Sequence, residues 1–169
     1  VQTEMAKVGK GPNVNLANLG KISVFNEYFG RGLSSIVFQE IRESKSLAYS
    51  SYVSYASSSE LNRPDYVTTY IGTQANKLPQ AVTAMDELMA NLPQIPAQFS
   101  NAKNAALKQI ASGRINRTNI YFNQLNLKKL GVDYDLRKDI YKEIEKLSLA
   151  DVTNFYNSEI KPMKYNTAI

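Results

Sequence analysis

The chain has 169 residues, of which 43% are hydrophobic and 21% charged, so it is long enough to bury a sizeable core. Its net charge of +5 comes from twenty basic residues scattered among fifteen acidic ones, which favours a mixed solvated surface over a nucleic-acid-binding patch. The chain contains no cysteine and no histidine, hence no thiolate or imidazole ligand for zinc and no Ser-His or Cys-His nucleophile pair. No apolar stretch is long enough to span a bilayer. We therefore expect a globular unit that binds no nucleic acid, spans no membrane and holds no catalytic zinc by itself.

The first part of the chain predicts one strand and two helices. Residues 1–8 are typical of a strand, and the "GKGPN" segment after them indicates a turn. Apolar residues spaced three and four apart predict a helix over 13–30, with Gly30 as its C-terminal cap. Glycines then make a bend, and one of two adjacent serines caps a second helix over 33–43.

The rest of the chain predicts a strand pair followed by helices. Tyrosine-, valine- and threonine-rich runs over 47–56 and 65–74 indicate an antiparallel hairpin. Helical periodicity then extends to the last helix, which starts at Ser148 in a capping-box pattern, before a strand entry at the chain end. Between the hairpin and this last helix, further helices are expected over 76–93, 97–112, 119–130 and 136–146. Grouped strands predict an α+β fold, an antiparallel sheet with helices packed on one face, and a single domain over 1–169 whose ends resemble those of a fragment.

The helix expected over 33–43 carries the first candidate functional residue. At 100° per residue, Leu33, Ile36, Val37 and Ile41 share one face, and Arg42 lies almost opposite them. Arg42 is therefore expected to point away from the core. Taken alone, this position also fits an ordinary solvated arginine.

A longer stretch resembles a known family. "FGRGLSSIVFQEIRESKSLAYSSYVSYAS", continued by "YIGTQANKLPQAVTAM", is similar to the non-zinc, C-terminal-type half of the pitrilysin and insulinase metallopeptidases, which include mitochondrial processing peptidase. The shared pattern is a small-residue turn, a helix ending in Arg-Glu, a polar turn and a tyrosine that opens a strand. It matches here at Ser34, Ser35, Phe38, Gln39, Glu40, Arg42, Glu43, Leu47 and Tyr49.

The resemblance implies a function that needs a second domain. In this family one half holds zinc on an inverted His-x-x-Glu-His motif, and the other half closes over the peptide and contributes an arginine and a tyrosine. By that resemblance Arg42 and Tyr49 are the catalytic and substrate-binding residues, placed to stabilise the oxyanion formed on a peptide carbonyl. The complete enzyme would then use zinc held by a pitrilysin-like domain, on the same chain or on a partner subunit. This chain alone would bind no metal and cleave no peptide.

Two alternatives stay open at this point. The chain could belong to a catalytically inactive structural or peptide-capturing subunit of the same superfamily. In addition, strand alternation places Tyr49 with the bulky residues Leu47, Val53 and Tyr55, which would bury its side chain rather than expose it.

Overall fold

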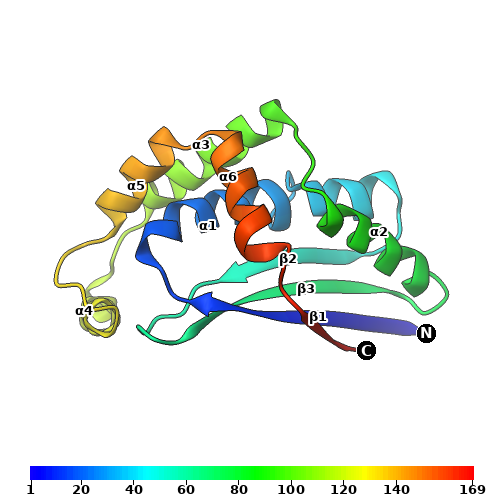
Figure 1. Cartoon of the computed structure of the whole chain (residues 1–169), viewed down its shortest axis with the longest axis horizontal. Helices are drawn as coiled ribbons and strands as arrows, with labels where there is room; N and C mark the ends of the chain where they lie inside the picture. Colours follow the sequence, from blue (N-terminus) through cyan, green and yellow to red (C-terminus); the bar gives the residue numbers. More distant parts are fainter.

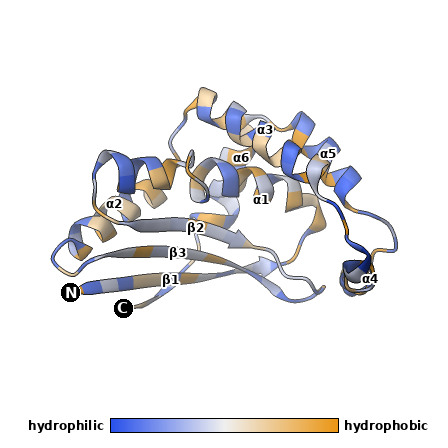
Figure 2. Cartoon of the chain, turned by 180° about the vertical axis from the view of Figure 1, so that it is seen from behind, coloured by the Kyte–Doolittle hydropathy of each residue, from blue (hydrophilic) through white to orange (hydrophobic).

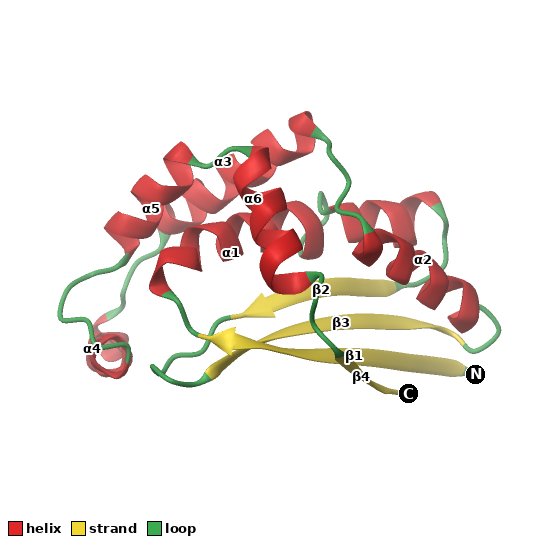
Figure 3. Cartoon of the chain, in the orientation of Figure 1, coloured by secondary structure: helices red, strands yellow, loops and turns green.

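A four-stranded antiparallel sheet lies beneath a layer of helices in the computed structural model, which describes residues 1–169 (Figure 1). The strand order is β2-β3-β1-β4, so β2 and β4 form the two edges of the sheet. The strands are β1 (Gln2–Asn13), β2 (Ser50–Ala56), β3 (Pro64–Gln74) and β4 (Tyr165–Ala168). Figure 3 shows the main helical layer on one face of this sheet, which confirms the α+β expectation.

The helical layer contains α-helices and shorter segments of other helix types. The α-helices are α1 (Leu19–Phe25), α2 (Leu78–Ala90), α3 (Pro96–Ser112), α4 (Ile120–Lys129), α5 (Arg137–Lys146) and α6 (Leu149–Phe155). Three π-helical segments, η2 (Asn26–Gly30), η3 (Phe38–Ser44) and η5 (Tyr156–Ile160), and two 3₁₀ turns, η1 (Leu16–Asn18) and η4 (Arg117–Asn119), complete it. None of these helices combines the length and apolar character needed to cross a membrane.

The first strand is longer than the sequence indicated. β1 pairs with β3 without interruption as far as Lys10, and after a register shift the pairing resumes at Asn13. The turn expected after residue 8 is therefore wrong. Pro12 has no backbone N–H, but it lies beyond the part of β1 that pairs with β4, which extends only to Gly9. A proline is tolerated there because it falls within the register shift between Lys10 and Asn13, where the regular β1–β3 ladder is interrupted.

One hydrophobic core of 26 buried residues lies between the sheet and the helices. Aromatic rings from α1, η2 and η5 meet at its centre, where Phe25 stacks on Phe29 at 5.5 Å and on Tyr156 at 6.0 Å between ring centroids. Figure 2 shows hydrophobic and hydrophilic residues alternating around the covering helices, as one-sided burial requires. This core fixes the helices, and with them the turn that leads into β2.

The helix expected over 13–30 is present as the consecutive segments η1, α1 and η2, but Gly30 has a different role from the one expected. It does not adopt a positive φ and is therefore not a left-handed cap. A Cβ atom on Gly30 would lie 1.9 Å from the carbonyl oxygen of Val53, so glycine is needed for close approach to β2. One turn earlier, the Asn26 side chain accepts from the Tyr55 N–H at 2.8 Å and donates to the Tyr55 carbonyl at 2.9 Å. These contacts cover the free edge of β2.

Other local signals had mixed outcomes. The expected helix over 33–43 begins only at Ile36, where Ser35 caps it by accepting from the Phe38 N–H at 3.3 Å. Leu33 therefore precedes the helix and is 73% exposed, so its expected place on the core face is wrong. The capping box at Ser148 is confirmed: its hydroxyl accepts from the Asp151 N–H.

Candidate active-site surface

A tight turn between η3 and β2 separates the two predicted site residues, Arg42 near the end of η3 and Tyr49 just before β2. The η3 segment widens at its end, where the Lys45 N–H donates to the Glu40 carbonyl, five residues back, at 3.2 Å. The chain then reverses through Ser46, whose φ of 50° lies in the left-handed region. The Leu47 N–H closes the turn by donating to the Ile41 carbonyl at 2.9 Å. The polar "ESKS" sequence thus ends the helix and redirects the chain toward the sheet.

Side chains from β3 and from the N-cap residue of α2 fix the position of this turn. The Thr73 hydroxyl donates to the Leu47 carbonyl at 2.5 Å, and the Lys77 ammonium donates to the Ser46 carbonyl at 2.9 Å. Thr73 is almost fully buried, so its anchor is shielded from water. The turn is therefore held against the end of the sheet and is not a free surface loop.

Tyr49 lies on the surface, which overturns the alternation argument that would bury it. Its side chain is 42% exposed, and the residue precedes β2, which begins at Ser50. The backbone N–H of Tyr49 donates to the Gly72 carbonyl at 3.1 Å. The ring lies over Gly72, where a Cβ would come within 3.0 Å of its Cε2 atom. Strand parity fails here because the chain has not yet entered the pleat of β2.

The phenolic oxygen of Tyr49 is oriented by a residue that sequence reasoning missed. The Gln2 side-chain amide donates a hydrogen bond to the Tyr49 hydroxyl oxygen. Because the phenol accepts in this contact, its own proton remains available for donation to another group. Gln2 opens β1, far from Tyr49 in sequence, and no local pattern connects the two residues.

Arg42 lies on the exposed side of η3, as the helical wheel predicted. Its guanidinium carbon is 4.9 Å from the centre of the Phe38 ring, and its Nε is 3.7 Å from the Glu43 carboxylate. The side chain remains 47% exposed. A loose exposed ion pair of this kind contributes little to stability, so Arg42 is free to bind another group.

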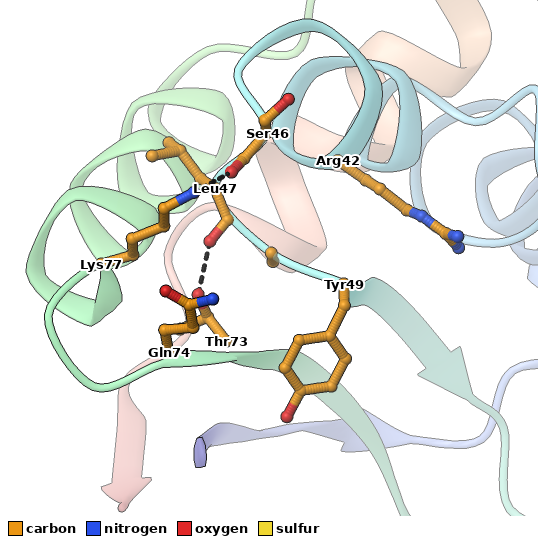
Figure 4. A pocket seen from close by; sticks show the side chains of 8 residues that line it. Arg42, Ser46, Leu47, Tyr49, Thr73, Gln74 and Lys77 are labelled. Atoms are coloured by element: carbon orange, nitrogen blue, oxygen red, sulfur yellow. Dashed lines mark hydrogen bonds between the residues drawn. The ribbon is translucent and has the colours of Figure 1, made fainter. Parts of the chain in front are cut away.

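Arg42 and Tyr49 line one cavity of about 210 Å³ at the end of the sheet (Figure 4). The two side chains extend from the turn in different directions rather than toward one another. The cavity contains two cations, from Arg42 and Lys77, and no acidic residue. Its complete lining is Arg42, Ser46, Leu47, Ala48, Tyr49, Thr73, Gln74 and Lys77. This chemistry suits a carbonyl oxygen or an anionic group.

The residues present do not fit a zinc ion. Neither imidazole nor thiolate ligands exist in the chain, and no group of three or more potential metal-ligating side chains comes together in the structure. The groups that this chain itself brings to the cavity include the Tyr49 phenol, the Arg42 guanidinium and the Lys77 ammonium group.

Comparisons with known proteins place the chain in a family. The family model described as "Peptidase M16 inactive domain" matches residues 2–106. Over 83 residues, 49% of this chain, the sequence is 41% identical to YmxG of Bacillus subtilis, named an uncharacterized zinc protease. The chain covers only 20% of that relative.

Solved structures share the whole fold at low sequence identity. The inactive peptidase domain of a proposed zinc protease from Bordetella parapertussis has a TM-score of 0.78 and 11% identity, over 100% of this chain and 93% of that one. Pitrilysin has a TM-score of 0.63 and 14% identity, over 97% of this chain and 18% of its own. The sequence resemblance to the pitrilysin-like metallopeptidases is thereby confirmed, and the chain belongs to the M16 peptidase family, within its inactive-domain group.

Proposed function

We propose that this chain is the complementing, substrate-binding domain of a zinc-dependent metalloendopeptidase. In this proposal it supplies Arg42 and Tyr49 to a site whose zinc is bound by a different domain. The observation that carries it is the single cavity that both side chains line, with a second cation and no carboxylate. Such a cavity attracts the polarised carbonyl oxygen of a peptide bond.

Each of the two residues has a distinct role in peptide-bond hydrolysis. Attack on the scissile carbonyl places negative charge on its oxygen, and a donor already aimed at that oxygen lowers the barrier. Tyr49 is suited to donate, because Gln2 occupies a lone pair of the phenol and leaves its proton free. Arg42 is suited to hold a neighbouring carbonyl or carboxylate, because its guanidinium is exposed and only loosely paired.

The zinc-bearing partner lies outside these 169 residues. The chain spans 20% of the Bacillus subtilis relative and 18% of pitrilysin, which leaves room for such a domain in proteins of this kind. For this chain, the zinc-bearing domain would be part of the same polypeptide or of a partner subunit. The substrate would be a peptide held in an extended conformation between the two domains.

The alternative is a catalytically inactive subunit that has a structural or peptide-capturing role. It predicts peptide binding without any dependence of turnover on the two cavity residues. Assays of the isolated chain give the same result for both functions, since both predict that it retains no zinc after dialysis and hydrolyses no peptide. Stoichiometric zinc retained by the isolated chain would contradict both.

Replacement of Arg42 in the complete protein separates them. Arg42→Ala should lower kcat/KM for a quenched fluorescent peptide about tenfold, and it should change the free energy of unfolding by less than about 0.5 kcal/mol. Arg63→Ala is the matched control, because Arg63 is likewise exposed and ion-paired but lies in the β2–β3 loop. Unchanged turnover in Arg42→Ala, or an equal loss in both variants, would argue against the proposed role.

A further inference from the structure

One face of the sheet is not covered by the helical layer. The helices that bury the core pack on the opposite face, and Figure 3 shows the lower face of β1 and β3 open. Tyrosines line this open face: Tyr52 of β2 stacks on Tyr70 of β3 at 5.1 Å between ring centroids, and Tyr66 is exposed farther along β3. The Tyr49 ring lies on the same face, since it covers the position where Gly72 would carry a Cβ.

A second cavity, of about 500 Å³, opens on this face beside the β2 edge. Its floor consists of small residues from both strands, and Tyr52 forms one wall. The loop after η2 also contributes to the lining, and Gly32 in this loop has a φ of 85° that few other residues adopt. The complete lining is Arg31, Gly32, Tyr52, Ser54, Ala56 and Thr68.

This cavity carries a positive charge from one lining residue. Arg31 is its only charged lining residue, and its guanidinium takes part in none of the ion pairs or side-chain hydrogen bonds of the structure. Lys10 of β1 pairs with Tyr66 and adds a second basic residue toward this end of the sheet. The nearest acidic residue on the same face is Glu4, which is paired with Gly72 at the Tyr49 end. This face thus carries the acidic side chain of Glu4 toward the Tyr49 end and the basic side chains of Lys10 and Arg31 toward the other end.

Strand geometry connects the two cavities. Tyr49 and Ser54 are five residues apart, and a strand advances about 3.3 Å per residue, which gives about 16 Å. The stacked pair Tyr52 and Tyr70 lies between them and forms an aromatic floor. An extended peptide has the same rise per residue, so it can contact Tyr49 and reach the Arg31 cavity about five residues farther on.

We propose that this second cavity, the Arg31 cavity, is a specificity subsite for an acidic side chain of the peptide substrate. That side chain would lie about five residues from the scissile bond, whose carbonyl oxygen accepts from Tyr49 in the proposed function. A glutamate or aspartate carboxylate there would pair with the unpaired Arg31 guanidinium while its aliphatic part packs on Tyr52. The small floor residues leave space for that side chain. This inference rests on the proposed function and adds a substrate class to it.

Binding of two matched peptides to the chain tests the subsite. The peptides are fluorescein-labelled, threonine- and alanine-rich and differ only in carrying glutamate or glutamine at one position, and fluorescence anisotropy gives each Kd. We expect the glutamate peptide to bind about fivefold more tightly, the upper range for an exposed ion pair, with a smaller difference at high salt. Arg31→Gln should remove that preference, whereas Arg63→Gln should keep it. The glutamate peptide should also perturb the amide resonances of Ser54 and Thr68.

The results that overturn the subsite are equal Kd values for the two peptides, no detectable binding of either, or an unchanged preference in Arg31→Gln. Failure of the subsite is distinguishable from failure of the proposed function. Tyr49→Phe should leave the glutamate preference intact, because Tyr49 does not line this cavity. A lost preference with a normal Tyr49 effect on turnover would therefore contradict the subsite alone.

Discussion

Tyr49 and Tyr55 lie six residues apart yet occupy opposite faces of the same sheet. Tyr55 is 3% exposed, and its hydroxyl donates to the buried carboxylate of Asp65 at 3.1 Å. Burial, followed by the nearby Asp65 charge, raises the pKa of Tyr55 well above its usual value. Tyr49 rests on Gly72 with its proton unused and its ring in contact with solvent.

The difference shows that a tyrosine on the core face stabilises the fold, whereas a tyrosine on the open face keeps its hydroxyl accessible to a substrate. Tyr55 has every polar group satisfied from within, since Asn26 binds both its backbone N–H and its carbonyl. Such a residue cannot exchange its partners without loss of stability. Tyr49 makes one accepted hydrogen bond, and a substrate can approach its donor. Removing core-face contacts should therefore destabilise the protein, whereas removing the Tyr49 hydroxyl should lower activity and leave stability nearly unchanged.

The largest effect on stability is expected at Gly30, where η2 touches β2. Gly30→Ala would place a methyl group 1.9 Å from the Val53 carbonyl oxygen, between two backbones that cannot both move. We expect a loss of about 3 kcal/mol or more in the free energy of unfolding, measured by urea denaturation. Gly32→Ala is the control, because a Cβ there meets no atom within 4 Å and only its φ of 85° is unfavourable. That variant should lose about 1 kcal/mol. Equal losses would mean that the close contact is not what requires glycine.

A second expected effect is loss of stability at alkaline pH. Burial raises the pKa of Tyr156 to about 12, whereas an unfolded tyrosine ionises near pH 10. Between these values the unfolded chain binds fewer protons than the folded chain, so stability falls as pH rises from 10 to about 12. The urea midpoint should decrease over that window, and Tyr156→Phe should decrease less steeply. A midpoint that stays constant to pH 12 would contradict a buried phenol in the core.

A smaller effect is expected when the Tyr55 hydroxyl alone is removed. Tyr55→Phe keeps the ring, which lies 5.6 Å from Phe155 between centroids, and deletes one hydrogen bond to a charged group. The loss should be about 1.5 to 3 kcal/mol, measured by urea denaturation. Asp65 keeps its bonds from Ser57 and Ser58, which sets the upper limit. A change no larger than that in Tyr49→Phe would remove the distinction between the two faces.

The sequence predicts local elements well where one short-range interaction decides them. The capping box at Ser148 and the arginine opposite the apolar face of η3 depend on neighbours within one or two turns, and both are confirmed. The helix boundary and the burial of Leu33 were missed because the glycine bend delays the helix to Ile36. A helical wheel drawn over residues 33–43 treats Leu33 as helical, although the helix begins only at Ile36.

Long-range contacts explain what the sequence could not predict about the site. Gln2 and Gly72 position Tyr49 only because β1 and β3 pair. Local sequence patterns do not predict the register of that pairing. Gly30 was predicted to be a helix cap because local sequence does not show the contact that requires glycine. That contact is with the Val53 carbonyl oxygen, which belongs to another element, β2. The family pattern identified Arg42 and Tyr49 as candidates but gave no information on their shared cavity or on Lys77.

Turnover by the complete, zinc-loaded protein with Tyr49→Phe tests the central claim most directly. This change removes one phenolic donor from an exposed ring, so the free energy of unfolding should shift by less than about 0.5 kcal/mol. Losing one oxyanion donor typically lowers kcat by about 100-fold to 1000-fold, and we expect a decrease of at least about tenfold with little change in KM. Tyr66→Phe, which alters another exposed tyrosine of the same open face that lines neither cavity, should leave kcat unchanged. An unchanged kcat in folded Tyr49→Phe would contradict the account and make Tyr49 an ordinary surface tyrosine.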